Sequence, residues 1–189
     1  FAEYELEEGS AGRAGRVSAR SDVLSFALGG LSKSIGLPQV KLGWIAFAGP
    51  DRLVTPALER LDVICDAYLS VATPVQAAAT ELLARGAAVR RQIASRVSTN
   101  YRHLQSAAAA APSCTVLRSD GGWYAVLQVP SLESEEDLAI GLLETENVFV
   151  HPGYFFDFPR ESFLVVSLLP ESGMFADGIA RILRRFPIA

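Results

Sequence analysis

Two lysines are the residues of this chain whose type and setting most plainly suggest chemistry. Between residues 23 and 50 the charged residues are Lys33 and Lys41, with no carboxylate nearby in the sequence. Burying an ammonium group costs free energy unless something compensates for it. One interpretation is that both side chains extend to the surface along apolar stems. The alternative is an anion-binding site beside a lysine that is desolvated, loses basicity and attacks a carbonyl to form a Schiff base.

The segment GGLSKS at residues 29–34 superficially resembles a phosphate-binding P-loop. A P-loop has a glycine directly before its lysine and a second glycine five positions before the first one. This sequence has Ser32 and Ala27 at those positions. The pattern therefore argues against a nucleotide-binding P-loop.

A longer stretch, residues 28–44, reads LGGLSKSIGLPQVKLGW. It closely resembles the active-site segment of fold-type I pyridoxal-phosphate aminotransferases, the class I/II superfamily, whose pattern is Ser-x-Ser-Lys, Gly-Leu-Pro, then Arg-x-Gly. The resemblance implies that Lys33 holds pyridoxal 5'-phosphate as a Schiff base, the internal aldimine. It also assigns Lys41 to the arginine position that binds the cofactor phosphate, and Ser32 to the serine before the lysine.

Later segments occur in the family's order, so the resemblance covers essentially the whole chain. They read SVATPVQAA at 70–78, DGGWYAVLQVP at 120–130 and VFVHPG at 148–153, before an amphipathic terminal helix. Family members are roughly twice this length. The resemblance therefore implies an α/β fold, the C-terminal half of a fold-type I enzyme. Residues 1–80 are expected to end the large domain and 81–189 to form the small one, with the boundary inside a long helix.

The function that the resemblance implies is amino-group transfer between a small-molecule amino donor and a keto acceptor by a homodimer. Lys33 would be displaced by the substrate amine and would then move a proton as the general base. The fragment alone is expected to be inactive, because most contacts to the cofactor ring lie upstream. Two alternatives stay open: another pyridoxal-phosphate reaction (decarboxylation, elimination or acyl condensation), or a regulator that uses the domain to sense the cofactor.

The sequence departs from the family pattern at functionally important positions. Gly30 replaces a phosphate-binding serine, and Lys41 replaces a forked guanidinium with a point charge. Val165 stands where the family carries the arginine that binds the substrate carboxylate. Losing that bidentate partner predicts weak activity on ordinary α-amino acids. Phe1 falls where a tyrosine contacts the phenolic oxygen of the cofactor.

Other candidate residues have both a functional and a structural interpretation. His151 precedes Pro-Gly in a loop that borders the active-site entrance in relatives, and it is either structural or a substrate contact. The aromatic residues after it line a substrate pocket or belong to the core: they are Tyr154, Phe155, Phe156 and Phe158. Arg160 is the arginine nearest to Val165, and its alternative role is an exposed loop residue. His103 is expected at the surface of a helix.

The composition of the 189 residues narrows the class of protein. Half are hydrophobic, 20% are charged and the formal net charge is −4, which argues against disorder and gives no basic stripe for nucleic acid. Cys65 and Cys114 are far apart with no His/Cys cluster, so no zinc site is expected. Two buried structural thiols are predicted, as in a cytosolic protein. No apolar stretch is long enough for a membrane span.

The elements that must position these residues follow from periodicity and turn residues. Buried strands are predicted at 23–28 and 41–48, a helix from Thr55-Pro56, and a helix from Thr73 that stops near Gly86. A long helix then runs until Pro112. Strands are predicted at 114–117 and 123–129 around a turn, and others at 148–150 and 163–169, with helices at 134–145 and at the end of the chain. Since the chain begins at Phe1 and its sole methionine is Met174, residues are expected upstream.

Overall fold

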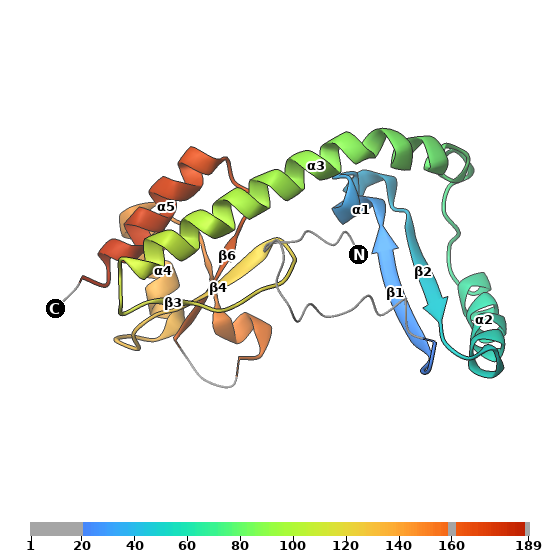
Figure 1. The fold of residues 1–189 in the computed structure, drawn as a ribbon, viewed down its shortest axis with the longest axis horizontal. Helices are drawn as coiled ribbons and strands as arrows, with labels where there is room; N and C mark the ends of the chain where they lie inside the picture. Colours follow the sequence, from blue (N-terminus) through green and yellow to red (C-terminus); the bar gives the residue numbers. More distant parts are fainter. Residues whose placement is uncertain (1–20, 159–161, 188–189) are drawn as a thin grey trace. The chain divides into compact units, whose positions relative to one another are not determined.

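The structure, a computed structural model, describes residues 21–158 and 162–187. These form two compact units that divide between Gln92 and Ile93, inside the longest helix (Figure 1). The first unit contains β1 (Ser25–Gly30), α1 (Leu31–Ser34), η2 (Pro38–Val40), β2 (Gly43–Ala48), α2 (Asp51–Asp66) and the first part of α3 (Thr73–Ala109). The second contains the rest of α3, β3 (Thr115–Val116), β4 (Tyr124–Gln128), α4 (Glu135–Glu146), β5 (His151–Pro152), η3 (Gly153–Phe156), β6 (Phe163–Ser167) and α5 (Ser172–Arg184).

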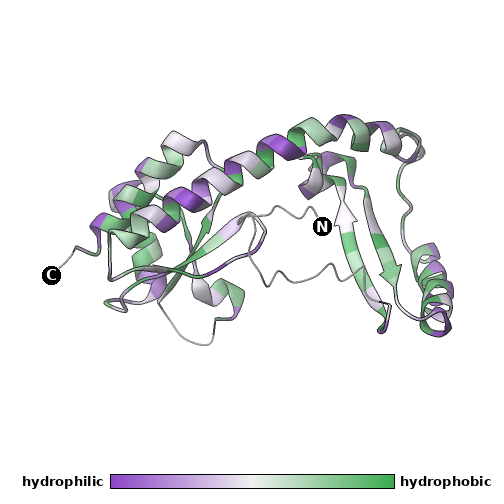
Figure 2. Ribbon diagram, in the orientation of Figure 1, coloured by the Kyte–Doolittle hydropathy of each residue, from purple (hydrophilic) through white to green (hydrophobic). Residues whose placement is uncertain are grey.

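The first unit is built on the antiparallel pair β1 and β2. Their register runs from Ser25 opposite Ala48 to Gly30 opposite Gly43, so the two predicted strands are confirmed. The prediction that they are buried was wrong. Phe26 and Leu28 are 47% and 56% exposed, and hydrophobic residues follow one another along both strands in Figure 2. The described part of the first unit therefore leaves one apolar face of this pair open.

Helix α2 begins earlier than the sequence predicted. It starts at Asp51, and the carbonyl of Pro50 accepts hydrogen bonds from Leu53 N at 2.8 Å and Val54 N at 3.0 Å. The fixed φ of Pro50 and the acidic Asp51 in the first turn both favour this start. Pro56 consequently lies inside the helix, at an exposed position where water can bond the carbonyl that proline leaves unpaired.

The two cysteines have different environments. Cys114 is buried, as predicted, and burial raises the pKa of its thiol against a smaller lowering by the hydrogen bond from Ser113. The prediction that Cys65 is buried was wrong, because this residue lies exposed near the end of α2. No residue of α2 is fully buried by the described part of the chain.

Helix α3 runs unbroken for 37 residues, roughly 55 Å at 1.5 Å per residue. The predicted stop at Gly86 was wrong: this glycine is buried in the helix, and a Cβ there would lie 2.8 Å from Ile35 Cβ. Gly86 therefore makes room for a packed side chain and does not end the helix. Despite this length, neither α3 nor any other helix in the described ranges is apolar enough to cross a membrane.

The second unit packs helices on a four-stranded antiparallel sheet in the order β3-β4-β6-β5 (Figure 1). Its core combines residues of α3, α4 and α5 with alternate residues of β4 and β6. They are Val97, Tyr101, Leu104, Leu138, Leu142, Phe175, Ile179, Ile182, Ala125, Leu127, Leu164 and Val166. The predicted apolar faces of α3 and α5 are thus confirmed in this unit.

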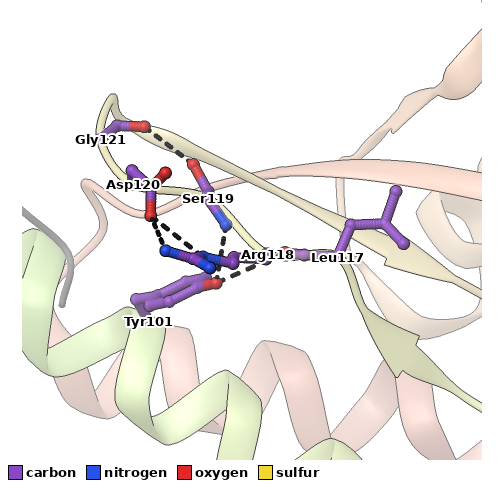
Figure 3. A network of polar contacts seen from close by, with 6 residues as sticks. All are labelled: Tyr101, Leu117, Arg118, Ser119, Asp120 and Gly121. Carbon is purple, nitrogen blue, oxygen red and sulfur yellow. Dashed lines mark hydrogen bonds and ion pairs between the residues drawn. The ribbon is translucent and has the colours of Figure 1, made fainter. Parts of the chain in front are cut away.

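The turn between β3 and β4 is tied to the core by Tyr101 (Figure 3). The buried phenol donates to the carbonyl of Leu117 at 3.4 Å and accepts from the amide of Ser119 at 3.1 Å. Arg118 and Asp120 form an ion pair at 3.0 Å on the outer side of the turn. The hairpin that the Ser-Asp-Gly-Gly sequence predicted is therefore confirmed.

The chain after α4 is held by one buried carboxylate. The strand predicted at 148–150 is displaced, because β5 consists of His151 and Pro152. Glu135, only 3% exposed, accepts hydrogen bonds from Tyr154 N at 2.8 Å and Phe163 N at 2.7 Å. A Cβ on Gly153 would lie 2.9 Å from the Glu135 carboxylate, so a glycine there permits the close approach. Glu135 therefore joins the start of η3 to the start of β6.

We predict that Glu135→Ala lowers the free energy of unfolding by about 2–4 kcal/mol, because two buried backbone N–H groups lose a charged acceptor. Glu135→Gln keeps one acceptor oxygen and should cost about half as much. Urea unfolding of the full-length protein checks this, with the exposed Glu144→Ala as control. Equal stability of the Glu135→Ala and Glu144→Ala variants would contradict the role assigned to the carboxylate.

Candidate active site

Lys33 lies on α1, a single helical turn directly after β1. Leu31 and Ile35 flank it and are 0% and 3% exposed, and Ile35 packs against the bare backbone of Gly86. Ser34 adds a hydrogen bond from its hydroxyl to the carbonyl of Gly30 at 2.7 Å. These buried contacts fix the turn, while the side chain of Lys33 is exposed.

Lys41 ends the same connection between β1 and β2. The connection is closed at its base by Leu31 N, which donates to the carbonyl of Leu42 at 3.0 Å. Within it Gly36 has a φ of +71° and faces open space, whereas Lys41 has a φ of 54° and is exposed. The structure thus places both predicted lysines on one short, internally bonded segment.

A hollow of about 600 Å³ lies beside Lys41. Its wall consists of residues 39–41, 69–72 and Val75, so the segment before α3 reaches the predicted phosphate-binding lysine. This brings the hydroxyl of Ser70 and the ammonium of Lys41 to the same hollow, a pair suited to an anion. The sequence did not predict that these two residues share a cavity, because they lie 29 positions apart.

Two smaller predictions concern the neighbours of Lys33. Ser32 precedes it on α1 and is half-buried. At Gly30, a departure from the family pattern, a Cβ would lie 3.0 Å from the carbonyl of Leu42. A serine at that position would crowd the backbone bond that closes the connection, so the glycine is consistent with this tight closure.

The environment expected for a reactive lysine is only partly present. Lys33 and Lys41 are both exposed, which matches the surface interpretation and not the desolvated one. What the described residues do provide is a primary amine on a fixed turn and a second cation at an anion-sized hollow. An amine so held can bond to an aldehyde, and the second cation can hold an anionic group.

Val165, in the second unit, is 3% exposed and lies in β6 between Val126 of β4 and His151 of β5. These register partners share one face of the sheet, because side chains alternate along each strand. Phe155 and Phe156 are 60% and 47% exposed, so the prediction that they belong to the core was wrong. Phe1 and Arg160 lie outside the described residues.

Comparison with known proteins gives one family. The family model described as aminotransferase class I and II matches residues 3–175. The alanine aminotransferase of Mycobacterium tuberculosis is 25% identical over 175 residues, which are 87% of this chain and 40% of that protein. The chain thus spans about 40% of the length of the curated relatives it matches.

Solved structures agree in fold. An alanine aminotransferase from Pyrococcus furiosus superposes with a TM-score of 0.74 at 17% identity, covering 88% of this chain and 43% of that one. A tyrosine aminotransferase from Leishmania infantum has a TM-score of 0.71 at 19% identity, over 88% of this chain and 42% of its own. The α/β fold is therefore that of part of these fold-type I enzymes.

The packing of Ile35 on Gly86 predicts an unusual sign for a glycine substitution. Gly86→Ala should lower the free energy of unfolding by about 1–2 kcal/mol, because the overpacking cost exceeds the usual gain of glycine-to-alanine in a helix. Gly178→Ala, in α5 with open space around it, should instead stabilise by about 0.5–1 kcal/mol. Thermal unfolding of the full-length variants measures both, and stabilisation by Gly86→Ala would contradict the packing argument.

Proposed function

Because the chain is a member of the class I and II aminotransferase family, we propose that its protein transfers amino groups with pyridoxal 5'-phosphate as cofactor. The observation that carries this proposal is the placement of Lys33 and Lys41 on one closed connection between β1 and β2. The substrates would be a small-molecule amino donor and a keto acceptor. Two widely spaced free thiols support a reducing, cytoplasmic setting.

The residues of the connection suit the cofactor. The primary amine of Lys33 would hold its aldehyde carbon, and the ammonium of Lys41 would hold its phosphate, with the hydroxyl of Ser32 as a further donor. The hollow beside Lys41, with Ser70 in its wall, supports the choice of an anionic group there. When bound, the cofactor supplies an electron sink that stabilises negative charge at the substrate Cα.

Lys33 has a second task in this proposal. Once the substrate amine has replaced it, its free amine would take a proton from the substrate Cα and return one later, as a general base and acid. Such a role depends on a fixed position, since small displacements cost large factors in rate. The buried side chains of Leu31 and Ile35 supply that fixation on either side of the lysine.

A second copy of the protein is the proposed partner. In the described chain the end of α2 and the residues after it expose large apolar side chains: Val63 at 73%, Ile64 at 53%, Tyr68 at 74% and Leu69 at 101%. Apolar surface of this extent usually marks an interaction site, and two-fold homodimers are the commonest assemblies. We also propose that residues 1–80 belong to the large domain and 81–189 to the small one.

One observation favours a different reaction on the same fold. Val165 is buried and apolar, and Val126 beside it is apolar too. A free α-carboxylate would find no bidentate partner at Val165. Decarboxylation, elimination or acyl condensation is therefore the second candidate.

The proposed role of Lys33 predicts a covalent link. The full-length protein with cofactor should absorb visible light, and borohydride reduction should abolish that band and fix the cofactor on Lys33. Lys33→Ala should remove the covalent link and retain some non-covalent binding through Lys41. Absorbance, reduction and peptide mapping check this.

Lys41→Ala is the matched control for the same assay. It should keep the covalent link and weaken cofactor binding about 10- to 100-fold, since a charged hydrogen bond contributes about 1.5–3 kcal/mol. Mapping of the reduced cofactor to Lys41 would show that the two roles are exchanged. Absence of any lysine-bound cofactor would reject the proposed function.

Val165 predicts the order of amino donors. Alanine, aspartate and glutamate should react on the order of 10²–10⁴ less efficiently in kcat/KM than in relatives that keep the arginine. Val165→Arg should improve these donors if the pocket has room for the guanidinium. A donor screen on the full-length enzyme tests this, with Arg160→Ala beside it. Robust turnover of alanine or glutamate that Arg160→Ala abolishes would contradict the prediction.

A further inference from the structure

A group of aromatic rings gathers around His151 on the second unit. We call it the His151 cluster; it consists of Tyr124, Phe149, His151, Phe155 and Phe156. The imidazole centroid lies 5.0 Å from the ring of Phe149, 6.1 Å from Phe155 and 6.2 Å from Phe156. Tyr124 joins through Phe156 at 6.4 Å. Residues from β4, β5, η3 and the segment before β5 therefore meet at one histidine.

The apolar rings of the cluster are open to solvent. Phe149 is 71% exposed, Phe155 60%, Tyr124 48% and Phe156 47%. Exposed aromatic surface is costly to hydrate, and where such side chains are grouped they usually mark a binding site. Ring centroids only 5.0–6.4 Å apart describe a surface about the size of one small organic molecule.

The imidazole at the centre has polar atoms to offer. In the described ranges of the chain His151 has ring contacts but neither a hydrogen bond nor an ion pair. Across the sheet it is the register partner of Val165, whose other neighbour is Val126. In this row of three side chains, His151 alone can donate a hydrogen bond or carry charge.

The cluster is also held in place. The buried carboxylate of Glu135 bonds Tyr154 N at 2.8 Å and Phe163 N at 2.7 Å, which fixes the segment that carries Phe155 and Phe156 at both ends. His151 is fixed by its pairing in β5. Preorganised rings bind a ligand with less loss of side-chain entropy.

We propose, building on the proposed function, that the His151 cluster binds the substrate of this enzyme. The substrate class is an aromatic or bulky apolar amino acid and the matching 2-oxo acid. The apolar side chain of the substrate contacts the exposed rings, and the imidazole of His151 donates a hydrogen bond to its carboxylate. His151 thereby supplies the polar contact that Val165 lacks.

Equilibrium binding of unreactive probes tests the proposal on the full-length protein with cofactor. The probes are 3-phenylpropanoate, with a ring and an acid; propylbenzene, with the ring alone; and propanoate, with the acid alone. His151→Phe keeps a ring and removes the donor, so it should weaken 3-phenylpropanoate about tenfold or more and leave propylbenzene within about twofold. Phe155→Ala should weaken both ring-bearing probes.

His103→Gln is the control, because His103 is the other histidine of the chain and is exposed on α3. It should change no affinity. Equal effects of His151→Phe on 3-phenylpropanoate and propylbenzene would overturn the proposal, as would equal affinity for propanoate and 3-phenylpropanoate. A failure here with Lys33 still binding cofactor would reject the substrate class alone, whereas loss of cofactor attachment at Lys33 would reject the proposed function.

Discussion

The contact between Ile35 and Gly86 is the constraint on which the lysine-bearing segment depends. Helix α1 has four residues, too few to be stable alone, and its hydrogen bonds cannot hold it in place. Its position comes from Leu31 and Ile35, which are buried, and from a glycine that lets Ile35 reach the backbone of α3. The long helix therefore acts as the support for Lys33, and the orientation of that lysine follows from packing on its two sides.

The second unit uses buried polar groups for the same purpose. Asn100 of α3 donates to the carbonyls of Leu168 at 3.0 Å and Pro170 at 2.9 Å, which fixes the chain as it leaves β6. Glu135 fixes the chain as it enters β6. Both ends of the strand that carries Val165 are thus held by side chains bonded to backbone groups. A buried partner is costly to leave unsatisfied, so these bonds strongly favour one arrangement.

The sequence predicted most strands and helices correctly because their apolar periods were clear, and the matching segment of the family placed Lys33 and Lys41 before any coordinates. It failed at residues whose role depends on distant neighbours. Gly86 reads as a helix stop unless Ile35 is known to pack on it, and Pro56 reads as a helix start unless Pro50 is seen to begin the helix. The His151 cluster was missed for the same reason, since its members meet only through strand register.

The two departures at Lys41 and Val165 change the site in the same direction. A guanidinium offers two parallel hydrogen bonds to phosphate or carboxylate, whereas an ammonium and a valine offer one and none. Recognition must then come from elsewhere in the chain. Ser70 shares the hollow of Lys41, and His151 pairs with Val165, so each departure has a polar group from another element beside it. Single donors orient a ligand less strictly than a fork does, and the exposed rings around His151 would add the missing orientation through shape.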